Sequence, residues 1–278
     1  MSNISPIKQE LIHRDPWEKL RQFTNARIGI GRVGTSIPTE ELLRFQLSHA
    51  QAIDAVHTPL DIKKLCEQFE TVPALRPYLP AQILRSEVQD RMEYLQRPDL
   101  GRRLNESSIY QLQQLREHQP FDVVFVIADG LSSCAIANHA KPFLDILINS
   151  LNEDSQKDWN VGPICVVEQG RVAVGDDACE TLNAKIVVLL VGERPGLSSP
   201  DSMGLYLTWN AKRGIEESLR NCISNIRPEG LSYNIAAHKC MYLLTESYKK
   251  QLSGIGLKDR SDDIQVEGTS SQQFCLII

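Results

Sequence analysis

Three segments of the sequence combine glycine with a carboxylate in a pattern that suits ligand binding. They are ADGLSS at 128–133, EQGRVAVGDD at 168–177 and VGERPGLSSP at 191–200. Glycine lets the backbone come close to a ligand, and the carboxylates of Asp129, Glu168 and Glu193 can accept hydrogen bonds. Each segment alone also fits a tight turn with capping serines. Because all three follow apolar runs, together they favour a binding site over unrelated turns.

A fourth glycine-rich segment, GIGRVG at 29–34, matches the pattern of dinucleotide-binding loops, but its surroundings exclude that function. No strand precedes it, and Pro38 interrupts the chain before the next helix. The acid about twenty residues later, Asp54, lies inside a helical pattern rather than at a strand end. We therefore reject nicotinamide binding and predict an interface loop here.

The sequence contains no self-contained set of catalytic or metal-binding residues. It has neither G-x-S-x-G nor a Walker phosphate loop, and its histidines and cysteines form no H-E-x-x-H or C-x-x-C motif. The tripeptide GLS occurs three times, each time before a predicted helix, at 130–132, 196–198 and 230–232. At such a position it can cap the helix and leave backbone amides free to bind a phosphate or amide ligand. We therefore expect a chain that holds a cofactor or a partner rather than one that performs chemistry alone.

Composition and charge exclude several classes of protein. The chain has 278 residues, 42% of them hydrophobic, and a net charge of -5, so it offers no basic surface for nucleic acid. No apolar run reaches the roughly 18 residues that a membrane-spanning helix requires. Seven scattered cysteines without C-x-x-C, and an N-terminus without an apolar signal region, are typical of a cytoplasmic protein with reduced thiols.

After Pro120 the chain alternates apolar runs with segments of helical length. The runs are rich in β-branched residues and apolar on both faces, which is typical of strands in a parallel sheet covered by helices on both sides. They span 122–128, 163–169, 185–191, 204–209 and 221–226. Helices are predicted at 135–151, 176–184 and 232–254. This alternation predicts an α/β fold with a doubly wound, mostly parallel, Rossmann-like sheet, whose carboxyl edge carries the three glycine-rich segments.

The first 120 residues are predicted to be helices interrupted by proline. Residues 39–56 form a helix with one apolar face, made by Leu43, Leu47, Ala50 and Ile53. A second helix is predicted at 101–118, with Asp99 as its N-cap. An irregular connection lies between the two helices, marked by Pro73, Pro77 and Pro80.

These patterns divide the chain into three parts. Residues 1–120 form a helical region that we expect to dock on a partner, since helices added to an α/β domain often serve that purpose. Residues 121–260 form the α/β domain that carries the binding edge. Residues 261–278 form a polar tail.

Six longer motifs follow one another along the chain: GRVGTSIPTEELLRFQLSHAQAIDAV, YLQRPDLGRRL, DVVFVIADGLSS, GRVAVGDD, VVLLVGERPGLSSPDSMG and RNCISNI. In this order they closely resemble the small subunit of ethanolamine ammonia-lyase. The resemblance runs from about residue 14 to 258, which is nearly the whole chain. VGERPGL together with RNCISNI is its most specific part.

The resemblance implies a lyase that depends on adenosylcobalamin and converts ethanolamine to acetaldehyde and ammonia. In that family the large subunit is a (β/α)8 barrel that binds substrate and faces the upper side of the cobalamin. The small subunit covers the lower side, and several large–small pairs assemble. The resemblance therefore places the catalytic residues on the large subunit, the cobalt in the cofactor, and the large subunit against residues 1–120.

The cofactor contacts of the family carry over to Val172 in GRV, Glu193 in GERPG and Cys222 in RNCISNI. We expect Val172 to give apolar cover, and Glu193 to accept hydrogen bonds from corrin amides or the nucleotide ribose. Cys222 is expected to pack as a small residue or to bind through its backbone. The chain lacks the D-x-H-x-x-G motif of enzymes that displace the lower base, which predicts that the benzimidazole stays on cobalt.

Two other functions compete with this one. A non-catalytic scaffold protein of the same fold would have lost cofactor binding, and the intact GERPG and NCISNI motifs argue against it. A stand-alone enzyme for a small molecule would need a phosphate fingerprint or a catalytic constellation.

Some relatives carry a long N-terminal extension associated with packaging in a bacterial microcompartment. Here 26 residues precede Arg27, and the microcompartment is kept as a second location beside the cytoplasm.

Overall fold

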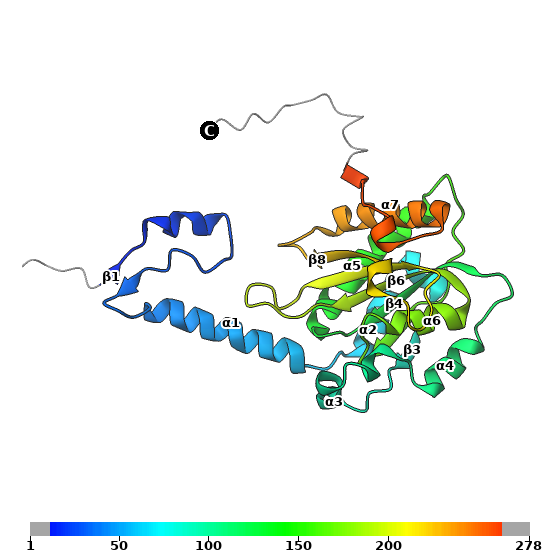
Figure 1. Cartoon of the computed structure of the whole chain (residues 1–278), viewed down its shortest axis with the longest axis horizontal. Coiled ribbons are helices and arrows are strands. Elements are labelled where there is room, and N and C mark those ends of the chain that lie inside the picture. Colours follow the sequence, from blue (N-terminus) through cyan, green and yellow to red (C-terminus); the bar gives the residue numbers. More distant parts are fainter. Residues whose placement is uncertain (1–11, 263–278) are drawn as a thin grey trace, which may run out of the picture.

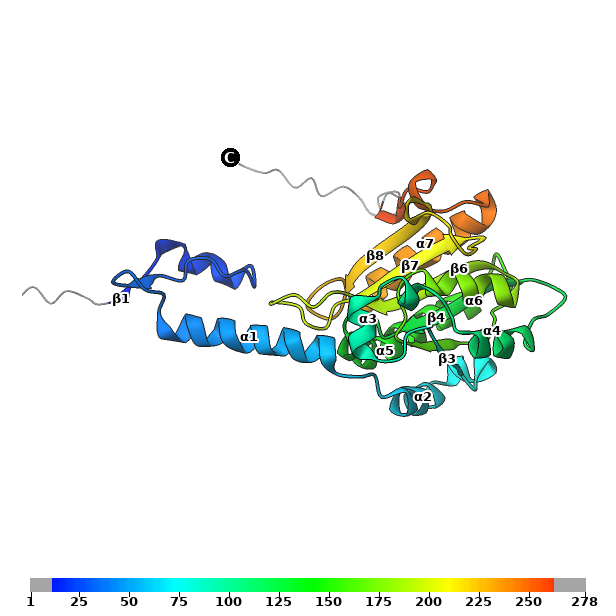
Figure 2. The same cartoon turned by 60° about the horizontal axis from the view of Figure 1, so that its bottom comes forward.

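The computed structural model describes residues 12–262, and at its centre lies a sheet of six strands in the order β3-β5-β4-β6-β7-β8 (Figures 1 and 2). The strands are β3 (Gln82–Arg85), β4 (Phe121–Ala128), β5 (Cys165–Glu168), β6 (Ala184–Gly192), β7 (Met203–Trp209) and β8 (Arg220–Ile226). The five strands expected from the sequence are thus confirmed. The fold is α/β, as predicted.

The direction of the last two strands differs from the prediction. β3, β5, β4 and β6 run parallel, but β7 pairs antiparallel with β6, and β8 pairs antiparallel with β7. A parallel connection needs a crossover of about a dozen residues or more. The loops at 193–202 and 210–219 are shorter than that, so the chain turns back on itself and the sheet is mixed.

Helices cover both faces of the sheet, which explains why the strand runs are apolar throughout. Along β4, alternate side chains enter two separate cores, with Phe125 in one and Val126 in the other. The first core lies under α2 (Ile62–Glu70), α5 (Ser133–Asn152) and α7 (Tyr233–Lys250). The second lies under α4 (Glu106–Gln113) and α6 (Val174–Leu182).

The helix starts agree only in part with the predicted caps. Ser132 caps α5 by accepting a hydrogen bond from the Ala135 N–H at 3.3 Å, as one GLS tripeptide predicts. The second tripeptide, at 196–198, precedes no helix, because β7 follows its loop. Asp99 makes no side-chain cap and stands before a short 3-10 helix, η3 (Leu100–Arg102), whereas Asn105 caps α4. The predicted helix at 101–118 therefore begins later and is shorter.

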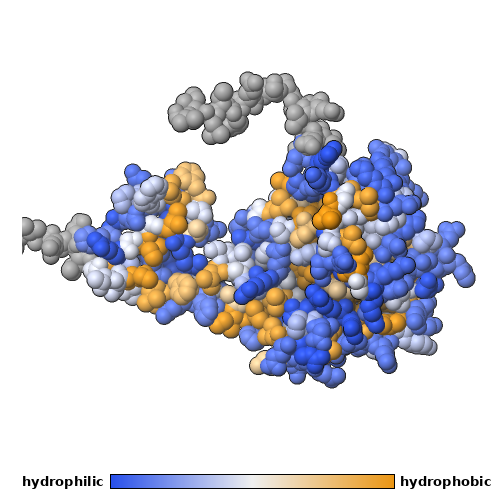
Figure 3. Space-filling view, in the orientation of Figure 1, coloured by the Kyte–Doolittle hydropathy of each residue, from blue (hydrophilic) through white to orange (hydrophobic). Residues whose placement is uncertain are grey.

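Residues 12–57 extend away from the sheet (Figures 1 and 2). They comprise a two-stranded ribbon and two helices, namely β1 (Ile12–His13), η1 (Pro16–Gln22), β2 (Arg32–Val33) and α1 (Thr39–His57). The predicted helix at 39–56 is confirmed as α1, but its apolar face is not covered by the described chain. Leu43, Leu47 and Ile53 are exposed, and Figure 3 shows hydrophobic residues gathered along this part of the molecule.

The predicted irregular connection contains structure that the sequence patterns missed. It holds a 3-10 helix, η2 (Pro73–Tyr78), and the edge strand β3, which is followed by α3 (Arg91–Gln96). Only Leu84 of β3 is buried, so this short strand lacks the apolar run that marked the others. Within residues 12–262, no helix is both long and apolar enough to cross a membrane. The predicted polar tail lies outside the described residues from 263 onward.

Candidate functional site

The loops that follow β4, β5 and β6 meet at one edge of the sheet, as predicted. The carboxylate of Asp129 accepts a hydrogen bond from the Gly170 N–H at 3.0 Å, which joins the first loop to the second. The Leu131 N–H donates to the Gly192 carbonyl at 2.9 Å, which joins the first loop to the third.

The glycines of these loops serve a different purpose from the one expected. Gly130 adopts a positive φ of 60°, and a Cβ there would collide with the carbonyl of Gly192. A Cβ at Gly192 would in turn collide with the carbonyl of Ser132. These glycines therefore let two loops pack backbone to backbone, which corrects the expectation that they open a path to a ligand.

The three carboxylates of these loops do not form one site. Asp129 is buried and lies 3.5 Å from the Arg91 guanidinium. Glu168 forms an ion pair with Arg85 of β3 at 2.5 Å. Glu193 instead faces β7 and β8. Only Glu193 is therefore placed where a ligand on those two strands would meet it.

Asp129 should make stability depend on pH. Burial raises the pKa of its carboxyl to about 6, against the opposing effects of Arg91 and nearby backbone N–H groups. The folded chain then holds this proton up to a higher pH than the unfolded chain, where Asp titrates near ~3.9. As pH rises from about 4 to about 6, the wild type should lose free energy of unfolding relative to Asp129→Asn. Urea unfolding across this range measures the difference, and equal slopes for both proteins would contradict it.

Glu193 is fixed by hydrogen bonds on one side of its carboxylate. Its Oε2 atom accepts from the Ser202 hydroxyl and from the Asn225 N–H, the latter at 3.2 Å. Asn225 adopts a positive φ of 58° beside a break in the β7–β8 register, which turns this N–H toward Glu193. The Oε1 atom of Glu193, which lies over Gly204, has no hydrogen-bond donor among residues 12–262. This oxygen remains available as an acceptor.

Val172, Tyr206 and Cys222 lie on the side of the sheet that α6 covers. Val172 is half-buried, and both it and Tyr206 pack against the core under α6. Tyr206 of β7 stands opposite Cys222 of β8 in the strand register. Loss of water around the sulfur raises the pKa of the Cys222 thiol, Tyr206 opposes this, and the charge of Glu193 adds to it. The thiol therefore stays protonated, which suits a packing role rather than a nucleophile.

These residues define an open face of β7 and β8, made by Val172, Glu193, Gly204, Tyr206 and Cys222. Sequence reasoning missed Tyr206. The one available signal was its place two residues after Gly204 in a predicted strand, since period-two alternation puts both on one face.

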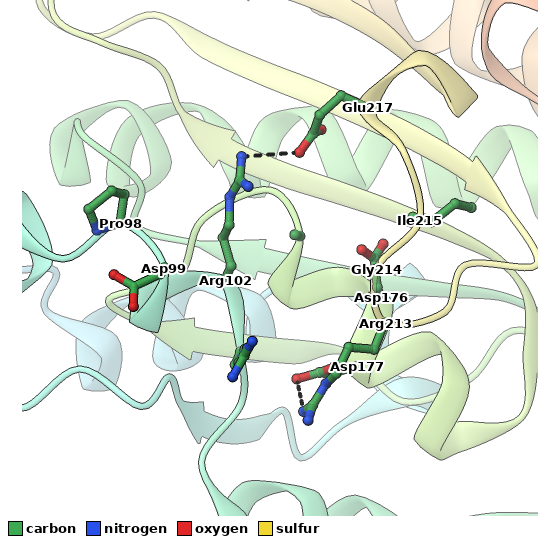
Figure 4. A pocket seen from close by; sticks show the side chains of 11 residues that line it. Pro98, Asp99, Arg102, Asp176, Asp177, Arg213, Gly214, Ile215 and Glu217 are labelled. Carbon is green, nitrogen blue, oxygen red and sulfur yellow. Dashed lines mark hydrogen bonds and ion pairs between the residues drawn. The ribbon is translucent and has the colours of Figure 1, made fainter.

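A cleft of about 570 Å³ is lined in part by Ala173, the residue after Val172 (Figure 4). Its walls come from three distant segments, at 98–103, 173–177 and 213–217. Beneath it, Arg220 forms two hydrogen bonds with Asp176, at 2.6 and 2.8 Å, and both side chains are almost fully buried. Arg213 holds Asp177 in the same two-pronged way, at 2.8 and 2.7 Å.

A hydrogen-bond network holds the loop at 193–202 in place. Buried His139 of α5 contacts Asp201 at 3.2 Å and the Tyr233 hydroxyl at 2.8 Å, so both of its ring nitrogens have partners. At its tip the same loop touches the N-terminal part of the chain, where Arg27 donates to the Leu197 carbonyl at 3.2 Å. The loop is therefore braced from both ends.

Two further sequence predictions concern metal ions and dinucleotides. Within residues 12–262, no group of three or more His, Cys, Asp or Glu side chains is arranged to hold a metal ion. The GIGRVG segment, residues 29–34, contains the two-residue strand β2, whose partner is β1. It therefore does not open a helix, as a dinucleotide-binding loop must.

Comparison with known proteins relates the whole chain to one family. The family described as ethanolamine ammonia-lyase light chain (EutC) matches residues 14–258. An ethanolamine ammonia-lyase small subunit of Pseudomonas fluorescens is 49% identical over 250 residues, covering 89% of this chain and 88% of the relative. One from Pseudomonas putida is 48% identical over 264 residues, covering 93% and 94%. One from Azotobacter vinelandii is 47% identical over 273 residues, covering 98% and 96%. This chain belongs to the ethanolamine ammonia-lyase small-subunit family.

Proposed function

We propose that this chain is the small subunit of an adenosylcobalamin-dependent ethanolamine ammonia-lyase. Together with a large subunit it would convert ethanolamine to acetaldehyde and ammonia, and this chain would cover the lower face of the cobalamin. The observation that carries the proposal is the near-half identity, over almost the full length, to proteins named as small subunits of this enzyme. We also propose that β3, β5, β4 and β6 form a Rossmann-like core.

The open face fits the chemistry of a corrin. A corrin is a flat macrocycle rimmed with amide side chains, and the small, exposed side chain of Cys222 leaves room on β8 for a flat ligand. Val172 and Tyr206 supply apolar surface, while Glu193 Oε1 supplies an acceptor for an amide N–H. Val172, Glu193 and Cys222 are therefore the proposed cofactor contacts.

The proposal assigns separate roles to the cofactor, to this chain and to the large subunit. When bound, adenosylcobalamin would supply the radical chemistry, and we propose that it is held here with its benzimidazole base on. The residues of this chain bind, orient and shield it from water. Substrate and catalytic residues belong to the large subunit under this proposal.

The uncovered apolar face of α1 is proposed to dock on the large subunit. Leu43→Glu combined with Leu47→Glu places two charges on that face, and each charge must then be desolvated when the subunits assemble. We expect the double variant to lose assembly with the large subunit in size-exclusion chromatography. Gln51→Glu, which adds a charge at an exposed position on the flank of α1, away from the stripe of Leu43, Ala50 and Ile53, serves as the control. Normal assembly of the double variant would show that the face lies outside the interface.

Ammonia release from ethanolamine tests the proposed function directly. It is measured with adenosylcobalamin for this chain alone, for the large subunit alone and for the two mixed. We expect release only from the mixture. A mixture that assembles but neither binds cobalamin nor releases ammonia would favour a non-catalytic scaffold, and turnover by this chain alone would favour a stand-alone enzyme.

A further inference from the structure

Among the arginines that line the cleft, Arg103 is the one that pairs with none of its carboxylates within residues 12–262. Each of its four carboxylates already has an arginine partner, namely Asp99 with Arg97, Asp176 with Arg220, Asp177 with Arg213 and Glu217 with Arg102. Arg103 also lines the cleft and is exposed. Its side chain makes no ion pair or hydrogen bond within residues 12–262. The cleft is therefore suited to a ligand group with one negative charge.

The cleft continues directly from the open face. Ala173, in its wall, follows Val172 in the chain. Arg220, which anchors the floor, lies two residues before Cys222 on β8, so both project from the same face. A large molecule on the open face can therefore extend one arm into the cleft.

We propose that Arg103 binds the phosphodiester of the cobalamin nucleotide loop in this cleft, an inference that rests on the proposed function. The phosphodiester is the one anionic group of the corrinoid skeleton and carries a single charge, which matches Arg103. Guanidinium and phosphate form paired charge-assisted hydrogen bonds. The nucleotide loop leaves the corrin on its lower side, which is the side that this chain is proposed to cover.

The neighbouring Arg102 supports the same group. Its ion pair with Glu217 is 3.2 Å long, and both side chains are 55% exposed. Exposed pairs of this kind hold their partners weakly. Arg102 can therefore turn toward a phosphate that enters the cleft, at little expense to the fold.

Two corrinoids separate this site from the rest of the cofactor surface. Adenosylcobinamide has the same corrin and adenosyl group as adenosylcobalamin, but it lacks the nucleotide loop. Each is titrated into the assembled complex with the large subunit, and binding is followed by absorption spectroscopy. For Arg103→Ala we expect the Kd of adenosylcobalamin to rise about tenfold to a hundredfold, while the Kd of adenosylcobinamide stays unchanged. Arg103→Lys keeps the positive charge but loses the paired guanidinium donors, so its Kd for adenosylcobalamin should lie between those of the wild type and Arg103→Ala.

Arg76→Ala is the matched control, because Arg76 is an exposed arginine on η2, which packs against helices of the opposite face. It should change neither Kd. Equal weakening of both corrinoids by Arg103→Ala would overturn the inference, and so would no change in either. A wild-type complex that binds neither corrinoid would instead refute the proposed function itself.

Discussion

Asp176→Asn should lower the free energy of unfolding by roughly 3–5 kcal/mol, because it strands a buried charge. The Arg220 side chain is only 3% exposed, and two hydrogen bonds to Asp176 compensate its charge. Its other acidic partner, Glu217, is 55% exposed and therefore a weak substitute. Urea unfolding of the full chain, followed by circular dichroism, measures the loss.

Asp99→Asn is the control for this change, since it makes the same substitution in the same cleft at an exposed ion pair with Arg97. It should cost far less stability than Asp176→Asn, because solvent screens an exposed pair. Adding Arg220→Met to Asp176→Asn removes the stranded charge and should recover part of the stability. If the single variant is as stable as the Asp99 control, the Asp176–Arg220 pair does not anchor the start of β8.

The strands after Pro120 were predictable because burial on two faces leaves a clear mark on sequence. Every residue of β4 is buried, and after Asp122 its run is apolar as far as Ala128. The α1 helix was predictable for a related reason, since Leu43 and Leu47 follow helical spacing even though nothing in the described chain covers them. In both elements the spacing of the apolar residues predicted the secondary structure.

The directions of β7 and β8 were not predictable from composition, because a buried strand has the same residues whichever way it runs. The short loops at 193–202 and 210–219 do indicate antiparallel strands, since neither loop is long enough for a crossover helix. The edge strand β3 left little mark, because only Leu84 among its residues is buried.

The candidate site also has one part that was predictable from sequence and one part that was not. Glu193 stands in a loop whose glycine, proline and charge were visible in the sequence. The cleft was not visible, because its walls come from segments at 98–103, 173–177 and 213–217 that only the tertiary fold brings together. Arg103 is one of many exposed arginines in the sequence, and its significance depends on the pairing of the carboxylates around it.

Glu193→Ala should weaken the affinity of the assembled complex for cobalamin by about 1–3 kcal/mol, which is the cost of leaving buried hydrogen-bonding groups without a partner. The substitution removes the Oε1 acceptor proposed for a corrin amide, and it also removes the Oε2 atom that holds Ser202 and the Asn225 N–H. Absorption titration of the complex with adenosylcobalamin measures the effect. Arg194→Ala, at the next position of the same loop and exposed, is the control.

Gly204→Ala tests the same carboxylate without removing it. A Cβ at this position would lie 2.8 Å from Glu193 Oε1 and 3.0 Å from its Cγ, so the carboxylate must shift. The shift involves the end of a flexible side chain, and the fold should therefore tolerate it. If Glu193 contacts the cofactor, this small change on β7 should weaken cobalamin binding in the same direction as Glu193→Ala. An unchanged Kd in both variants would remove Glu193 from the site and leave its carboxylate with one role, the bracing of the 193–202 loop against β8.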